Sequence, residues 1–316
     1  MTSTVDNNAR YWAYSNYLIA LSRLLNQEYP SDSLLTTTIA NSQGFKQLSR
    51  ATPSLDQNTL SKTLRHSWFT ELLLWEKVKY PNLLPFAIPW SMVESYYTVY
   101  PTIRAYFLAC GRTEVTAHEA TLRTICSDVC NYKDRFPPPW NCVLYGDPNT
   151  SPLFVTNVTQ PILLNNPLIS PYTGDPWQHY GLFLKTTRRR QIDRLIQKWK
   201  KDNHRKQIPK IERQRITQRW RPTTLFDTLY RIRSRSNYQD VDSFAFCNAT
   251  TLGFTELQIA ICEVVYKTML VFEMSIARLI SKRTFKTMVK DFASTNLGQS
   301  AKSTVLKRWS CILQSF

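Results

Sequence analysis

Large apolar side chains return at intervals of three or four residues along most of this chain, and this repeat matches one face of an α-helix. Leu64, Trp68 and Leu72 show the pattern most clearly, because each lies one helical turn beyond the last. The same spacing predicts main helices at residues 9–28, 60–79, 91–110, 115–131 and 254–282. The chain is therefore expected to bury helical faces against one another.

Glycine is scarce, with 7 residues in a chain of 316. Turn-dense β-sandwiches, propellers and glycine-rich nucleotide loops usually need more. Apolar residues make up 43% of the chain, which is enough for a substantial core and excludes a wholly disordered protein. We therefore expect a mostly α fold. Gly111 is placed to end the helix over 91–110, and Pro101 is expected to kink it.

Residues 136–180 differ from the rest, because nine of the 17 prolines lie there. A structureless loop of this length is unusual in a compact domain. Short apolar runs at residues 141–145 and 153–158 indicate strands. We expect an inserted lobe with a few short strands.

Positive charge is concentrated in two segments. Residues 185–221 hold fifteen Lys or Arg against three Asp or Glu, and residues 278–308 hold eight against one. The two segments therefore carry surpluses of +12 and +7, while the whole chain has a net charge of +17. The remaining residues together are close to neutral. Such segments attract polyanions, with nucleic acid first and an anionic membrane surface second.

A basic amphipathic helix is predicted over residues 187–206, with Ile192, Leu195, Ile196 and Trp199 forming its apolar stripe. Trp199 and Trp220 alternate with the cations, which suits backbone contacts combined with stacking on unpaired bases. Alternatives are an acidic protein partner, an anionic lipid surface or solubility alone. The predicted nucleic-acid-binding residues are Arg188, Arg189, Arg190, Arg194, Lys198, Trp199, Lys200, Lys201, Arg205, Lys206, Arg213, Arg215 and Arg219.

Several features predict a cytoplasmic protein without a cofactor. The polar first residues contain no apolar run typical of a signal peptide. Charged residues interrupt the most apolar stretch, 254–280, so a transmembrane helix is not expected there. Seven cysteines lack the spacing of a disulfide framework or a zinc site, and we expect reduced thiols and no metal.

The most informative stretch is residues 95–119, where a tyrosine-rich helix carries Arg104 and ends at Gly111. A short polar turn follows, and His118 opens the next helix, with five residues between it and Arg112. This order resembles the HEPN superfamily of small α-helical domains. A second stretch supports the resemblance, because residues 229–240 contain an arginine-rich helix end followed by a tyrosine and an aspartate.

The resemblance covers residues 63–131 and 225–282 and implies an antiparallel helical bundle. Residues 132–224 would then be an inserted lobe carrying the basic helix. Residues 1–62 would form an N-terminal helical extension, and residues 283–316 a basic C-terminal tail.

The resemblance also implies an activity. HEPN-like proteins of defence or toxin type include metal-independent ribonucleases that work as homodimers. Arg112 would hold the scissile phosphate and His118 would take the proton of the 2′-hydroxyl. Arg104 would complete the site, and Arg235, Tyr238 and Asp240 would support it. Cleavage by the 2′-hydroxyl would restrict the enzyme to RNA.

Simpler interpretations of the same residues stay open. His118 could cap a helix, Arg112 could form a surface ion pair, and Arg104 could face an internal carboxylate. Asp240 could be a helix N-cap. The alternative function is a non-catalytic nucleic-acid-binding or scaffold subunit of a larger complex. A regulator with an unrelated fold, which docks an acidic partner through its basic helix, is the third possibility.

Overall fold

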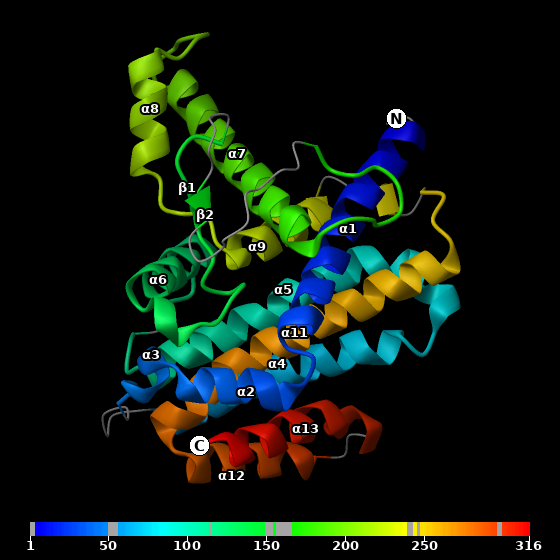
Figure 1. The fold of residues 1–316 in the computed structure, drawn as a ribbon, viewed down its shortest axis with the longest axis vertical. Helices are drawn as coiled ribbons and strands as arrows, with labels where there is room; N and C mark the ends of the chain where they lie inside the picture. The colour runs from blue at the N-terminus through cyan, green and yellow to red at the C-terminus, as the bar shows by residue number, and fades with distance from the viewer. Residues whose placement is uncertain are drawn as a thin grey trace.

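The computed structural model describes residues 4–49, 56–113, 115–148, 154–155, 166–238, 243–244, 247–295 and 299–316. Helices make up nearly all of its regular structure, which confirms the mostly α expectation (Figure 1). None of the helices in these residues has both the length and the apolar character needed to cross a membrane.

The described residues of the first half of the chain form helices and the turns between them. In order they are α1 (Thr4–Glu28), α2 (Asp32–Asn41), α3 (Gln43–Lys46), α4 (Gln57–Lys77), the short 3₁₀ helix η1 (Pro81–Leu83), α5 (Leu84–Ala109), α6 (His118–Asn131) and the 3₁₀ helix η2 (Lys133–Arg135).

The second half begins with a small antiparallel ribbon and returns to helices. Its elements are β1 (Leu144–Tyr145), β2 (Phe154–Val155), α7 (Pro176–Asp202), α8 (Lys210–Arg219), α9 (Leu225–Tyr238), α11 (Thr251–Ile280), α12 (Lys282–Ala293) and α13 (Gln299–Ser315).

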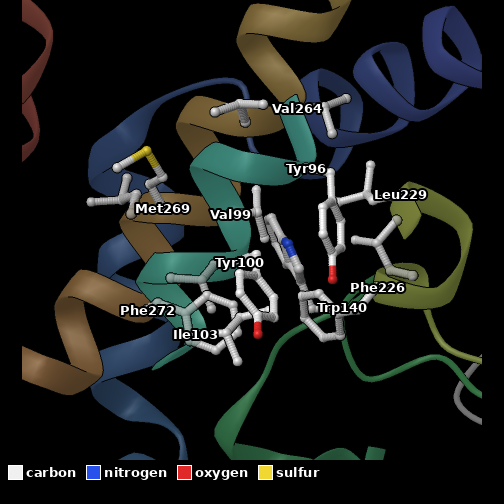
Figure 2. Packing of buried hydrophobic residues seen from close by; sticks show 14 of the residues in the cluster. Tyr96, Val99, Tyr100, Ile103, Trp140, Phe226, Leu229, Val264, Met269 and Phe272 are labelled. Carbon is white, nitrogen blue, oxygen red and sulfur yellow. The ribbon is translucent and has the colours of Figure 1, made fainter. Parts of the chain in front are cut away.

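The core lies around α5, which packs against α4, α9 and α11. The helix α5 runs without interruption through Pro89 and Pro101, and most of its residues are buried. Its packing against α9 and α11 is shown in Figure 2, where the labelled side chains include Tyr96, Val99, Tyr100, Ile103, Phe226, Leu229, Val264, Met269 and Phe272.

Gly111 ends α5, as the sequence predicts. It adopts a left-handed φ of 73°, a conformation that costs glycine little. Its amide donates to the Leu108 carbonyl at 2.9 Å, and the Arg112 amide donates to the Phe107 carbonyl at 3.1 Å. These bonds satisfy two carbonyls of the last turn and direct the chain toward α6.

The basic helix is longer than the predicted range of 187–206, because α7 begins eleven residues earlier. Asp175 caps its first turn, and Pro176 occupies a position where a helix needs no amide donor. The apolar first half packs on α1, with the rings of Tyr17 and Phe183 stacked at 4.5 Å. The basic second half reaches beyond the bundle beside α8 (Figure 1).

The C-terminal segment, expected as a basic tail, packs into the fold through α12 and α13. Arg308 of α13 is fully buried and forms ion pairs with Glu71 of α4 and Glu273 of α11. Its Nε lies 2.9 Å from a Glu273 oxygen. One basic residue of this segment is therefore a core residue that joins three helices.

Candidate functional site

His118 is the first residue of α6, and its position is set by α5. The residue before it, Ala117, is the N-cap and forms no side-chain capping bond. The Tyr100 hydroxyl donates to the Thr116 carbonyl at 2.5 Å, which fixes the turn that enters α6. Nδ1 of His118 lies 2.9 Å from the Tyr96 hydroxyl, and either atom can donate, depending on the tautomer. The imidazole is thus held on α5 by one ring nitrogen.

Tyrosine rings surround the imidazole. Tyr96, Tyr97 and Tyr100 come from α5, and Tyr230 comes from α9. The ring centroid of His118 lies 5.4 Å from that of Tyr96 and 6.0 Å from that of Tyr97. It lies 4.6 Å from that of Tyr100 and 5.8 Å from that of Tyr230. We call these four tyrosines and His118 the tyrosine–histidine cluster. Tyr96 and Tyr100 are also buried core residues, so packing and the positioning of His118 are served by the same side chains.

Two arginines act on His118 electrostatically. Burial lowers the pKa of His118 below its ordinary value, and the positive charges of Arg233 and Arg104 lower it further. Arg233 donates to the Tyr97 hydroxyl at 2.6 Å, and the Arg104 guanidinium lies 5.8 Å from the centre of the Tyr100 ring. The result is a neutral imidazole at pH 7 beside two cations.

Arg112, predicted to act together with His118, is directed elsewhere. Its Nη2 donates to Asp128 Oδ1 at 2.8 Å, and Asp128 is buried. Asp128 lies ten residues after His118 on α6, a rise of about 15 Å along the helix. The guanidinium of Arg112 therefore lies away from His118. Arg112 does form an ion pair, but its partner is a buried carboxylate and not a surface one, as the simpler interpretation expected.

The other predicted members of this site lie in or after α9. Arg235 is half-buried on α9, two residues beyond Arg233. Tyr238 is the last residue of α9, and its side chain lies outside the described structure, as does Asp240. Sequence reasoning missed Tyr230 and Arg233, although their three-residue spacing on a predicted helix places them on one face.

A second cationic feature is the groove between the ends of α7 and α8, which we call the α7–α8 groove. It has a volume of about 410 Å³. Trp199 and Trp220 both line it, so the structure brings together the two tryptophans that the sequence places among the cations. The cationic side chains at its walls are Lys198, Arg215 and Arg219, and all of them are exposed. Asp202 and Glu212 line it too, so the cations exceed the carboxylates by one.

Arg188 has a structural role in place of the predicted nucleic-acid contact. The residue is fully buried, and its guanidinium donates to three carbonyls. Nε donates to Gly146 at 2.6 Å, and the two terminal nitrogens donate to Arg221 and Thr217, both at 3.0 Å. Burial lowers the pKa of Arg188 to about 10. Arg188 thus joins α7 to the turn after β1, to α8 and to the segment between α8 and α9, and its buried side chain is inaccessible to nucleic acid.

The remaining predicted contacts differ in exposure. Two of them form ion pairs: Arg215 with Glu212 at 2.7 Å, and Arg213 with Asp147 at 3.2 Å. Half-buried members of the set are Arg190, Trp199, Lys200 and Arg213. Exposed members are Arg189, Arg194, Lys198, Lys201, Arg205, Lys206, Arg215 and Arg219.

Comparisons of the chain with models of protein families, with curated proteins and with solved structures found no match. Among the described residues, no group of three His, Cys, Asp or Glu side chains is arranged to hold a metal ion. What this site can do therefore follows from its own geometry and charge.

Proposed function

We propose that this protein binds RNA and cleaves it without a metal ion, as an HEPN-like ribonuclease of defence or toxin type. One observation carries the proposal: a half-buried imidazole of lowered pKa lies beside Arg104 and Arg233 and is held by Tyr96. A general base must be neutral near the working pH, and a cleaved phosphodiester needs nearby cations.

The proposed reaction uses the 2′-hydroxyl of the RNA as nucleophile. His118 takes its proton through Nε2, while Nδ1 remains bonded to the Tyr96 hydroxyl. The 2′-oxygen forms a bond to phosphorus, and the bond to the 5′-oxygen breaks. The leaving 5′-oxygen takes up a proton from water, and His118 afterwards returns its proton to solvent. The products are a 2′,3′-cyclic phosphate and a 5′-hydroxyl. Arg104 and Arg233 stabilise the extra negative charge at phosphorus, a role that the resemblance assigned to Arg112.

The α7–α8 groove would capture the RNA. Its exposed cations can contact phosphates, and Trp199 and Trp220 offer ring faces to unpaired bases. Binding of this kind is electrostatic and depends steeply on salt concentration. The HEPN resemblance also predicts a homodimer, which light scattering after gel filtration would test.

The test compares the wild type with His118→Ala and with His66→Ala, a matched control. His66 is an exposed histidine on α4, outside the tyrosine–histidine cluster. Each protein is incubated with tRNA or total RNA in EDTA, and the 3′ ends of the products are identified. We expect cyclic phosphate ends from the wild type and from His66→Ala, and a loss of about 100-fold or more in rate from His118→Ala.

A second candidate is a non-catalytic nucleic-acid-binding subunit of a larger complex. The ion pair between Arg112 and Asp128 favours it, because that pair removes one predicted phosphate ligand. If the wild type and His118→Ala shift RNA equally in a binding gel and neither cleaves, this second function replaces the first.

A further inference from the structure

A second pocket lies between facing sides of α7 and α9, beside the α7–α8 groove, with which it shares Leu195 and Trp220. We call it the arginine pocket. Its volume is about 320 Å³, at the lower end of the range of small-molecule sites. Arg190 and Arg194 line it from α7, one helical turn apart, and Arg231 and Arg233 line it from α9. Four guanidinium groups thus surround a space that suits one small ligand.

The two acidic residues of the pocket are already engaged by another arginine. Asp227 is buried, and its two oxygens accept from Arg221 at 2.7 and 2.8 Å. Glu119 also accepts from Arg221, at 3.3 Å. Arg221 does not line the pocket, so its charge offsets these carboxylates from outside. The pocket therefore keeps a surplus of positive charge.

Arg231 is fixed by neutral groups. Its Nη1 donates to the hydroxyls of Thr186 and Thr187, at 2.7 and 3.1 Å. Its guanidinium lies 5.6 and 5.9 Å from the ring centres of Tyr14 and Phe183. These contacts hold the guanidinium in place and leave its charge available to an anion, which is the preorganisation that a tight anion site requires.

The other walls are aromatic and apolar. Trp220, Tyr230 and Leu195 line the pocket, and Trp220 and Leu195 also line the α7–α8 groove. A flat aromatic ring can stack on the indole, while guanidinium groups bind phosphate oxygens in pairs. This combination fits a ligand with a phosphate at one end and a base at the other.

We infer that the arginine pocket binds a free nucleoside monophosphate, with the phosphate on the arginines and the base against Trp220. The inference goes beyond the proposed RNA cleavage, because it assigns a site for a free small molecule, which neither capture nor cleavage of RNA requires. Tyr230 and Arg233 belong both to this pocket and to the surroundings of His118, so a bound nucleotide would act directly on the tyrosine–histidine cluster.

The experiment is calorimetric titration of the full chain with AMP, adenosine and inorganic phosphate, each without RNA. We expect AMP to bind more tightly than either fragment. Arg194→Ala should weaken AMP binding about tenfold, because it removes one charged donor. Arg189→Ala is the matched control, since Arg189 is an exposed neighbour on α7 outside the pocket. Trp220→Leu should weaken AMP binding and leave phosphate binding unchanged.

Three outcomes would overturn the inference: no saturable binding of AMP at millimolar concentration, equal losses in Arg194→Ala and Arg189→Ala, or phosphate binding as tight as AMP. Circular dichroism of each variant identifies any loss that comes from misfolding. The His118→Ala protein should bind AMP like the wild type. Failure of the ribonuclease proposal therefore leaves this one intact, and the reverse also holds.

Discussion

The hydroxyl of Tyr96 lies 2.9 Å from Nδ1 of His118, and this contact joins the buried face of α5 to the first residue of α6. Burial raises the pKa of Tyr96 well above its ordinary value, so its hydroxyl stays neutral at any working pH. A neutral hydroxyl can hold one imidazole nitrogen without charging the ring. The other nitrogen then has a defined direction, which a general base needs.

Arg233 should set the protonation of His118. Because its charge lowers the pKa of His118, Arg233→Gln should raise that pKa toward the ordinary value near 6.5. The histidine resonances followed by NMR across pH 5 to 8 measure the shift, and Arg189→Gln is the control of equal charge change. An unchanged or lower pKa of His118 in Arg233→Gln would contradict the expected effect of the Arg233 charge on His118.

The lowered pKa of His118 also makes the stability of the fold depend on pH. A histidine whose pKa is lower when folded binds fewer protons than in the unfolded chain. The contribution of such a histidine to the free energy of unfolding is complete above about pH 6.5, and it is lost as the pH falls through the pKa of the folded state. His118→Gln should therefore lose less stability than the wild type between pH 7.5 and 5 in urea unfolding.

Arg188 and Arg189 are neighbours with opposite roles. Arg188→Met should destabilise the fold by about 3 kcal/mol, because it removes three hydrogen bonds of a charged donor and leaves the carbonyls of Gly146, Thr217 and Arg221 without their partner. Arg189→Met should change stability by less than about 0.5 kcal/mol, since the residue is exposed. Urea unfolding at pH 7 compares the two. A stability loss in Arg189→Met equal to that in Arg188→Met would contradict this assignment.

Exposed cations of the α7–α8 groove should control RNA affinity. For single-stranded RNA, removing one cation that binds a phosphate should reduce the slope of log affinity against log salt by about 0.7. Replacement of Lys198, Arg215 and Arg219 by glutamine should therefore weaken binding most at low salt. Fluorescence anisotropy at several salt concentrations measures this. If the glutamine variant has the same slope of log affinity against log salt as the wild type, these cations do not bind RNA phosphates.

Much of the fold was predictable, because helical periodicity and the end of α5 at Gly111 depend on local sequence. The start of α7 was missed, since its first half, residues 176–186, is apolar and lacks the charge pattern that marked the second half. The cap at Asp175, with Pro176 directly after it, is the local signal that could have located this start.

The site was less predictable, because it depends on contacts between distant segments. Arg188 looks like its basic neighbours in sequence, and its burial depends on carbonyls at Gly146, Thr217 and Arg221. Arg112 was assigned from its spacing to His118, but the buried carboxylate of Asp128 determines where it points. Sequence reasoning pointed to His118 and to Arg104, but it could not point to Arg233, whose position beside His118 depends on the packing of α9 against α5.

Arg308 should be the most sensitive basic residue of the C-terminal segment. It is fully buried between Glu71 and Glu273, and the indole of Trp68 also donates to Glu273, at 2.8 Å. Arg308→Met should destabilise the protein by about 3–5 kcal/mol, because two carboxylates would remain buried without a counter-charge. Lys307→Met is the matched control, since that side chain is 67% exposed and its ion pair should contribute less than about 1 kcal/mol.

The stability difference between Arg308→Met and the wild type should depend on pH in a defined direction. Burial already raises the pKa of Glu71, and removal of the arginine should raise it further. Protonation then neutralises the uncompensated carboxylates in the folded variant, so the variant regains stability relative to the wild type as pH falls from 7 toward 5. Urea unfolding of both proteins across this range measures the difference. If the difference in unfolding free energy between the two proteins stays constant or grows at low pH, Arg308 contributes by packing and not by charge.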